Sequence, residues 1–331
     1  MKILIFSVLT SNSWNTCNTL LYSFILVSFS LISLMGFSYA FDNSTASSKS
    51  NEFNFVAAGD FGCNAEANKT IQSMTFMKPE LVLALGDLAY KKNPNCWLDM
   101  IKPLENNSKF MISFGEHDLS HGFGAYNLYL KHFNLTKPYY SFDYGNVHFL
   151  AMATPKNSLI PYNVSSEQYQ FVNDDLKSAN ENKSINWIVV YAFRPFYSSN
   201  TTHPGLDELQ DAYHPLFDKY HVDLVLQAHN HNYQRTYPLS YNVNKLHNPT
   251  ITNRNTDQYD NIGKGEIFLT LGTGGAEFYN FTSQAPYIVK QLLLHGFLNV
   301  NVTDNGTKLL ATFYDHTGVA RDQIAISKTK T

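Results

Sequence analysis

The chain has 331 residues, of which 44% are hydrophobic and 15% aromatic, and its formal net charge is -3. This composition supplies apolar material for a large core, which excludes an intrinsically disordered chain. The charge is close to neutral and Lys and Arg are not clustered, which argues against a nucleic-acid surface, because phosphate backbones are bound by clustered cations. We therefore expect a globular protein of one or two domains that binds no nucleic acid.

The first forty residues differ from the rest of the chain. Residues 20–37 are a strongly apolar run without a charge. Ser38 and Ala40 are small residues at the two positions that a signal peptidase inspects, which predicts a signal peptide over 1–40. The alternative is an uncleaved membrane anchor, because the run is near the lower length limit of a spanning helix. In either case we expect a secreted or otherwise extracytoplasmic protein that contacts a membrane only through such an anchor.

Residues 41–51 are polar and rich in serine, as is typical of a linker, so one folded domain is expected over 52–331. After cleavage of the signal, Cys63 and Cys96 are the remaining cysteines. An even pair in an oxidising compartment indicates a disulfide, and two free buried thiols are the alternative. Asn-x-Ser/Thr sequons, which indicate a glycoprotein, occur at Asn43, Asn68, Asn106, Asn134, Asn163, Asn182, Asn200, Asn280, Asn301 and Asn305.

Between residues 53 and 231, short apolar runs alternate with helical patterns. The runs are typical of buried strands and lie at 53–60, 81–87, 109–118, 147–154, 186–193 and 222–231. The helical patterns lie at 64–77, 97–105, 165–180 and 206–219. Toward the C-terminus, strands are expected without helices between them, at 266–275, 296–303 and 308–315, with an Asn-Gly turn at 304–307. This order predicts an α/β fold that mixes parallel and antiparallel strands in one domain.

Residues of types that can bind metal ions stand at the ends of these apolar runs. They are Asp60, Asp87, Glu116, His117, Asp118, His229 and His231. Ligands of α/β sheets bind beyond the C-terminal ends of the strands, so we expect these side chains to meet there. Carboxylates together with imidazoles suit Zn, Mn or Fe better than Ca. A carboxylate shared by two ions about 4 Å apart would suit an in-line displacement at phosphorus by a metal-activated water.

The order of these motifs resembles that of the calcineurin-like metallophosphoesterases, and within them the purple acid phosphatase branch. The motifs are Gly59-Asp60-Phe61-Gly62, Gly86-Asp87-Leu88-Ala89-Tyr90, Gly115-Glu116-His117-Asp118, Phe193-Arg194-Pro195 and Ala228-His229-Asn230-His231. Tyr90, three residues after Asp87, is typical of the branch, as are the segments 194–200 and 231–238. The resemblance covers about residues 53–320 and implies a four-layer α/β/β/α sandwich with two mixed sheets.

The resemblance also implies a role for each matching residue. Four residues would bind one ion, usually ferric iron: Asp60, Asp87, Tyr90 and His231. Asp87 would bridge to a second ion, Fe, Zn or Mn, which His229 would also bind. His117 corresponds to the histidine that contacts the phosphate and protonates the leaving group, with support of its loop as the alternative role. A Tyr90 phenolate is chemically reasonable beside Fe(III), which lowers the pKa of a bound phenol.

Two positions depart from the family pattern. Glu116 occupies the position of an asparagine ligand of the second ion, and Phe193 that of a histidine ligand. Three roles are open for Glu116: a metal ligand, an ion-pair partner of Arg194, or a general base at a single ion. His203 and His121 are candidates for the missing nitrogen ligand. Arg194 and His203 are also candidate substrate-binding residues, with a structural ion pair as the alternative for Arg194.

Two hypotheses of different class follow from this pattern. The first is an exported, metal-dependent phosphoesterase, similar to acid phosphatases, that hydrolyses small phosphomonoesters. The second is a protein that keeps the fold and one ion but not catalysis, and binds metal or phosphate at the cell surface. Phe193 favours the second hypothesis, because a phenyl ring cannot bind a metal ion. The sequence indicates neither the natural substrate nor the oligomeric state.

Overall fold

The computed structural model describes residues 51–120, 123–155, 160–260 and 265–328. The expected signal peptide or anchor over 1–40, most of the linker, the sequon at Asn43 and the candidate ligand His121 lie outside the described residues. Within these ranges, no helix is both long enough and apolar enough to cross a membrane.

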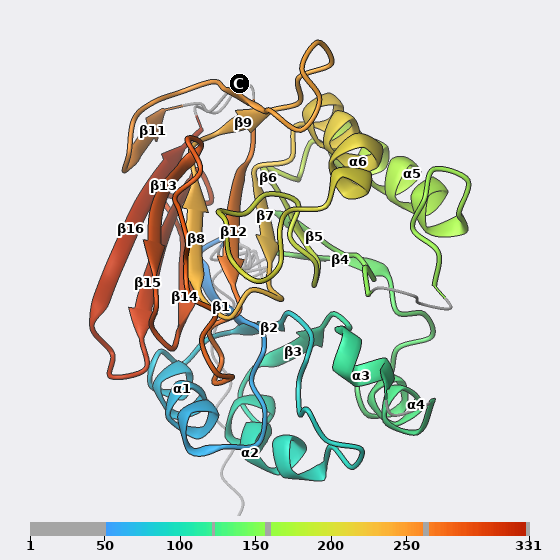
Figure 1. Ribbon diagram of the computed structural model, residues 1–331, viewed down its shortest axis with the longest axis vertical. Helices are drawn as coiled ribbons and strands as arrows, with labels where there is room; N and C mark the ends of the chain where they lie inside the picture. Colours follow the sequence, from blue (N-terminus) through green and yellow to red (C-terminus); the bar gives the residue numbers. More distant parts are fainter. Residues whose placement is uncertain (1–50, 121–122, 156–159, 261–264, 329–331) are drawn as a thin grey trace, which may run out of the picture. The chain divides into compact units, whose positions relative to one another are not determined.

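Two seven-stranded sheets form the centre of the described unit (Figure 1). The first sheet has the order β11-β16-β15-β14-β1-β2-β3, with β1 Phe53–Ala58, β2 Leu81–Ala84, β3 Lys109–Ile112, β11 Gln258–Asp260, β14 Gly296–Thr303, β15 Lys308–Asp315 and β16 Ala320–Ser327. The second has the order β13-β8-β12-β7-β6-β5-β4, with β4 Tyr140–Tyr144, β5 Val147–Ala151, β6 Trp187–Tyr191, β7 Leu224–Gln227, β8 Tyr233–Thr236, β12 Ile267–Leu271 and β13 Ile288–Leu292. A short separate pair is formed by β9 Leu239–Ser240 and β10 Thr250–Ile251.

Both sheets mix strand directions. In the first sheet β1 pairs with β2 in parallel and with β14 antiparallel. In the second, β7 pairs in parallel with β6 and β12, whereas β8 runs antiparallel to β12. The predicted mixture of parallel and antiparallel strands is therefore confirmed.

Helices cover the outer face of each sheet (Figure 1). They are α1 Ala65–Phe76, α2 Asn95–Glu105, α3 Glu116–Ser120, α4 Phe123–His132, α5 Glu167–Glu181 and α6 Asp207–Tyr220. Residues of α1, α2 and α4 pack on the first sheet, and residues of α5 and α6 pack on the second. The inner faces of the two sheets share a third apolar cluster. These layers are the predicted α/β/β/α sandwich.

Strand β1 shows why the buried strands are continuous apolar runs in the sequence. Phe55 and Ala57 face the second sheet, while Val56 and Ala58 face the helices. Because successive side chains of a strand point to opposite faces, a strand covered on both sides needs apolar residues at every position. All of the expected runs contain a strand, although 109–118 divides into β3 and the helix α3.

Cys63 and Cys96 form a disulfide, with their Cα atoms 5.9 Å apart. Cys63 lies in the loop after β1, and Cys96 lies in the first turn of α2. The bond therefore ties the loop that carries Asp60 to a helix on the outer face of the first sheet.

Candidate active site

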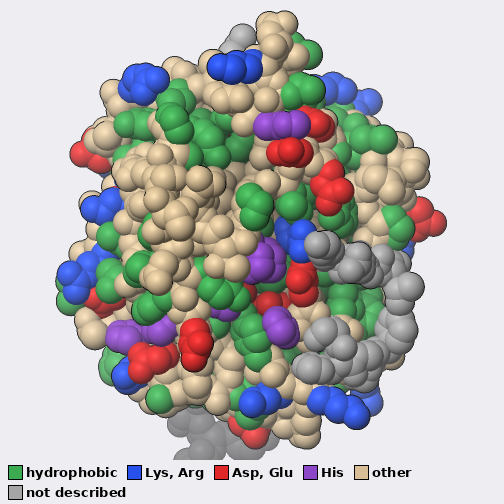
Figure 2. All heavy atoms as spheres, viewed as in Figure 1, with side chains coloured by type: hydrophobic (Ala, Val, Ile, Leu, Met, Phe, Trp, Pro, Cys, Tyr) green, Lys and Arg blue, Asp and Glu red, His purple; other side chains and the backbone are tan. Residues whose placement is uncertain are grey.

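Loops at the C-terminal ends of three strands carry five of the predicted ligands. Asp60 follows β1, Asp87 and Tyr90 follow β2, and His229 and His231 follow β7. All except His231 have a positive φ, between 49° and 68°. Residues other than glycine rarely adopt this left-handed conformation, and it concentrates at functional sites, where the surrounding structure holds it in place. Figure 2 shows histidine, acidic and basic side chains gathered near the middle of the viewed face.

Three of the predicted ligands lie in contact with one another. The Tyr90 hydroxyl donates to Oδ1 of Asp60 at 2.9 Å and is 3.0 Å from Nε2 of His231. That nitrogen is 3.4 Å from the same Asp60 oxygen. Nδ1 of His231 lies 2.6 Å from the carbonyl oxygen of Glu277 and donates to it. This hydrogen bond leaves the lone pair of Nε2 directed toward Asp60 and Tyr90, as in histidines that bind metals.

Asp60 and Asp87 are both almost fully buried, with 0% and 2% of their surface exposed. Burial raises the pKa of Asp87 well above its ordinary value, and the charge of Asp60 raises it further. Burial acts to lower the pKa of His231, but Asp60 outweighs this effect and the pKa is raised. Two neighbouring buried carboxylates oppose each other's ionisation unless a cation lies close to both. The charge of these side chains therefore favours a bound cation.

Asp60 and Asp87 also fix the backbone around them. The second oxygen of Asp60 accepts the N–H of His229 at 2.8 Å, and Asp87 accepts the N–H of His117 at 2.8 Å. Gly115 has to be glycine, because a Cβ there would lie 2.2 Å from Oδ1 of Asp87. The loops after β1, β2, β3 and β7 are thus connected through two carboxylates.

His229 lies under the ring of His203. The ring centroids are 3.7 Å apart and the rings are nearly parallel, at 19°. Burial, followed by the charges of His203 and Arg194, lowers the pKa of His229 to about 2. A neutral imidazole at this position suits a metal ligand, because only the neutral ring has a free lone pair.

The loop that carries His203 is attached to the strand end by Asn230. The Asn230 amide donates to the carbonyl oxygen of His203 at 2.6 Å and accepts the N–H of the same residue at 3.1 Å. Burial lowers the pKa of His203. His203 is thus held in its stack on His229, the residue that the family pattern assigns to the second ion.

Glu116 forms an ion pair with Arg194. Nε of Arg194 donates to Oε1 of Glu116 at 2.9 Å, and Nη2 contacts the same oxygen. Arg194 is 7% exposed, and its backbone N–H donates to Thr154. Among the three roles open for Glu116, this geometry corresponds to the ion pair.

Phe193 fills the space beside His229. Its side chain is fully buried, and the two ring centroids are 4.7 Å apart. A Cβ added at Gly86 would lie 2.8 Å from the phenyl ring. An apolar ring therefore packs closely at the position where the family pattern has an imidazole.

His117 and Asp118 have different environments. His117 is exposed and packs over Tyr90, with ring centroids 4.5 Å apart. Asp118 is buried and accepts the N–H groups of Asp87, Leu88 and Gly115 at 2.8–3.0 Å. Burial raises the pKa of Asp118 to about 6, although these hydrogen bonds act in the opposite direction. Asp118 therefore anchors the loops, while His117 faces the opening of the site.

Two contacts in the site were not predicted from the sequence. Tyr279 stacks on His231, with centroids 4.0 Å apart, and the Glu277 carbonyl fixes the tautomer of the same ring. Both residues belong to the segment after β12. Only the neighbouring Gly-rich stretch 272–275 marks this segment in the sequence, as a tight bend.

Residues 53–233 match the sequence profile of the calcineurin-like phosphoesterases. The match spans more than half of the chain. The chain belongs to this family. The resemblance expected from the motif order is thereby confirmed, and so is the fold that it implied.

This calcineurin-like phosphoesterase is similar to purple acid phosphatases of Arabidopsis thaliana. It is 28% identical to purple acid phosphatase 21 over 241 residues, which cover 67% of this chain and 49% of the relative. It is 24% identical to the probable inactive purple acid phosphatase 24 over 311 residues, which cover 84% of this chain and 47% of the relative. The chain thus spans about half the length of the curated relatives it matches, and two of these are described as probable inactive purple acid phosphatases.

Two solved structures share the phosphoesterase fold. The purple acid phosphatase PPD1 from yellow lupin seeds matches with a TM-score of 0.72 and 23% identity, over 85% of this chain and 54% of that one. GAP50, the anchor in the inner membrane complex of Plasmodium, matches with a TM-score of 0.65 and 15% identity, over 85% and 90%. At these identities the similarity is one of fold.

Proposed function

We propose that this protein is a metal-dependent phosphoesterase that hydrolyses small phosphomonoesters. The observation that carries the proposal is the contact set of Asp60, Tyr90 and His231 at the ends of β1, β2 and β7. Ferric iron is the proposed ion at this set, because a phenol is an unusual ligand that suits a strongly acidic metal ion.

The distances within the set fit a bound ion. Donor atoms about 2.1 Å from an octahedral ion lie roughly 3 Å apart when they are neighbours. The three distances among Asp60 Oδ1, Tyr90 Oη and His231 Nε2 are 2.9, 3.0 and 3.4 Å. Asp87 would complete the set and bridge to a second ion, Fe, Zn or Mn, beside His229. When bound, the ions would supply the positive charge that activates water and polarises the phosphoryl group.

Side chains at the opening of the site would handle the substrate. His117 is exposed, and its backbone is fixed by Asp87, so its ring can reach the oxygen of a leaving group and donate a proton to it. His203 is positioned by Asn230 and can donate one N–H to a phosphate oxygen. Arg194 could contact the substrate only through the guanidinium N–H groups that do not bind Glu116.

The proposal is tested by the hydrolysis of p-nitrophenyl phosphate with the purified protein, supplied with Fe, Mn or Zn. We expect turnover, and a loss of more than about 100-fold in Asp87→Asn, because even partners of metal ligands cost 10–100-fold when removed. Asp99→Asn is the matched control, since Asp99 is exposed and pairs with Lys102 on α2, away from the proposed ligands. Absence of turnover with all three metals over the acid and neutral pH range would contradict the proposal.

A specific observation favours a second candidate function. Phe193 and the Glu116–Arg194 pair occupy the side of the site where the family pattern binds its second ion. If that side holds no ion, the protein would bind a metal ion or phosphate without hydrolysing esters. Measurable binding of phosphate together with absent turnover would support this candidate.

We further propose that the protein is exported and glycosylated. The disulfide between Cys63 and Cys96 suits an oxidising compartment. Most described sequon asparagines are exposed, namely Asn68, Asn106, Asn134, Asn163, Asn182, Asn200, Asn280 and Asn305. Sequencing the N-terminus of the mature protein tests this proposal. A new N-terminus at residue 41 supports a cleaved signal, an intact N-terminus on a membrane-bound protein supports an anchor, and an unprocessed cytosolic protein contradicts export.

A further inference from the structure

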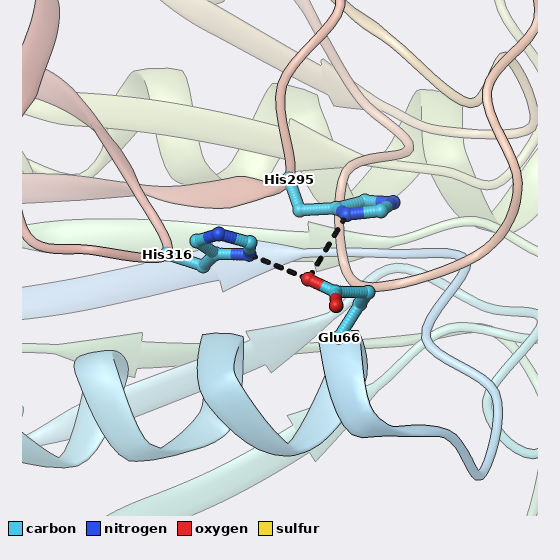
Figure 3. A group of neighbouring side chains, drawn as sticks. All are labelled: Glu66, His295 and His316. Carbon is cyan, nitrogen blue, oxygen red and sulfur yellow. Dashed lines mark ion pairs between the residues drawn. The ribbon is translucent and has the colours of Figure 1, made fainter.

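A second group of candidate metal ligands lies beside helix α1, away from the Asp60 set. It consists of Glu66, His295 and His316 (Figure 3). Glu66 is in the first turn of α1, His295 immediately precedes β14, and His316 follows β15. Figure 3 shows both imidazoles directed at the Glu66 carboxylate, and Figure 2 shows histidine and acidic side chains side by side in the region of α1.

The distances within this group suit one small cation. Oε2 of Glu66 is 3.1 Å from Nδ1 of His316 and 3.7 Å from Nδ1 of His295. One ligand atom from each of the three residues lies within 4.8 Å of the other two. Ligand atoms of a tetrahedral Zn²⁺, at about 2.0–2.1 Å from the ion, are roughly 3.3 Å apart.

The tautomer of His295 supports metal binding. Its Nε2 donates to the carbonyl oxygen of Ala276 at 2.9 Å, so in the neutral ring Nδ1 has the lone pair. A lone pair that faces a carboxylate oxygen is unfavourable unless a proton or a metal ion lies between them, and the proposed site places a metal ion there. A histidine whose second nitrogen donates to a backbone carbonyl is the usual arrangement of a zinc ligand.

His316 provides an independent observation. Its Nδ1 is buried, and no hydrogen-bond partner satisfies it among the described residues, although the Glu66 oxygen is only 3.1 Å away. Buried polar atoms without a partner are uncommon and indicate an absent ion or water. The backbone N–H of His316 donates to the carbonyl oxygen of His295 at 2.9 Å, which fixes the two histidine loops relative to each other.

The neighbouring charged side chains bind other atoms and not Oε2 of Glu66, the oxygen proposed to bind the ion. Lys69 binds Oε1 of Glu66, at 2.8 Å, and not Oε2. Asp315 is occupied by Arg321 and by Thr317. A pocket of about 450 Å³ adjoins the group and is lined in part by Phe278. It has room for the water that completes the coordination of an open zinc site.

We propose that Glu66, His295 and His316 bind one Zn²⁺ through Oε2, Nδ1 and Nδ1, with water as the remaining ligand. The ion would join α1 to the loops before β14 and after β15. It would also be linked to the catalytic site by two hydrogen bonds. His295 donates to the carbonyl oxygen of Ala276, and the Ala276 N–H donates to the backbone oxygen of Asp60 at 2.9 Å. This site is separate from the proposed catalytic ligands and does not depend on their function.

The zinc content of the purified protein after dialysis against Zn²⁺ tests the site. We expect His316→Gln and Glu66→Gln each to bind one Zn²⁺ per chain fewer than the wild type. His132→Gln is the matched control, because His132 is likewise a histidine paired with a glutamate, Glu105, at 2.7 Å, and should keep the wild-type zinc content. Zn²⁺ should also raise the melting temperature of the wild type more than that of either variant.

Equal zinc content in the wild type and in both variants would overturn the site and leave an ordinary histidine–carboxylate ion pair. If His316→Gln does not fold, Glu66→Gln decides alone, because its side chain is 36% exposed and its replacement leaves the core unchanged. Loss of one ion in Glu66→Gln but not in a folded His316→Gln would also contradict the three-ligand site. Because the readout is a difference of one ion, it is independent of whether the catalytic ligands are loaded or active.

Discussion

Glu116 and Phe193, on the side of the site next to His229, are the two residues that differ from the family's ligands of the second ion. Arg194 is 7% exposed, and its Nε lies 2.9 Å from Glu116. A buried guanidinium needs its carboxylate, because an uncompensated buried charge costs about 3–5 kcal/mol. Oε1 of Glu116 is thus engaged by the contact that stabilises Arg194, as the ion-pair role requires.

The double variant Glu116→Asn with Phe193→His removes the carboxylate partner of Arg194 and should be less stable than the wild type. We expect its folded form to have about 10-fold or more higher phosphatase activity, because it restores both ligand types of the family pattern. The measurement is kcat/KM for p-nitrophenyl phosphate at saturating metal. Glu116→Asn with Phe193→Tyr is the control, since it keeps an aromatic ring but supplies no imidazole. Equal activities of the two double variants would show that the missing imidazole does not limit catalysis.

His117 provides a second prediction at the scale of single residues. If it protonates the leaving group, His117→Asn should lower kcat about 10²–10⁴-fold for a phenyl or alkyl phosphate. The loss should be much smaller for p-nitrophenyl phosphate, whose leaving group needs no proton. An equal loss for both substrates would instead indicate a role in binding or in support of the loop. His132→Asn is the control for the loss of an exposed histidine.

At the scale of secondary-structure elements, the buried strands are the part of the fold that the sequence predicts best. β1, β2 and β7 were predictable because they are covered on both faces and so contain almost only apolar residues. The candidate ligands were predictable for a related reason, since they stand where these runs end. The disulfide was foreseen from the number of cysteines and is present.

Strand β8, Tyr233–Thr236, shows where such reasoning fails. It is fully buried, yet it contains Gln234 and Arg235. Gln234 accepts the N–H of Ser199 at 2.7 Å, and Arg235 binds Asp322 on β16 at 2.6 Å. Polar residues can occupy a buried strand only when distant parts of the chain supply their partners. No local pattern reveals those partners, and the same applies to Tyr279 over His231.

His148 provides a prediction at the scale of elements. It joins β4, β5 and α5, because its Nδ1 is 2.7 Å from Asp143 and its Nε2 is 2.8 Å from Asp175. Burial acts to lower the pKa of His148, but the two aspartates outweigh it and the pKa is raised. A raised folded-state pKa means that the stabilisation is complete below the ordinary value of about 6.5 and is lost as the pH rises through the folded-state pKa.

We expect His148→Gln to lower the free energy of unfolding by about 1–3 kcal/mol at about pH 5.5 and by clearly less at about pH 9. Urea denaturation at both pH values measures this difference. His132→Gln, which removes an exposed histidine with one carboxylate partner, should have little effect at either pH. A loss that is equal at both pH values would show that the charge of His148 does not contribute.

At the scale of the whole molecule, the two groups of proposed ligands are connected through one segment. The segment after β12 holds His231 through Glu277, and it holds His295 through Ala276. The first group was predictable, because each ligand follows a strand and the motif order matches a family. The second was not, since Glu66, His295 and His316 are far apart in the sequence and come together only when β14 and β15 pack beside α1.

The ligand set of Asp60, Tyr90 and His231 carries the proposed function, and the visible absorption spectrum of the iron-loaded protein tests it most directly. We predict a purple band from the contact of ferric iron with the Tyr90 phenolate. The band should disappear in Tyr90→Phe and persist in Tyr279→Phe, which alters the neighbouring phenol that stacks on His231. An iron-loaded wild type without the band, or a band that survives Tyr90→Phe, would contradict the proposed metal set.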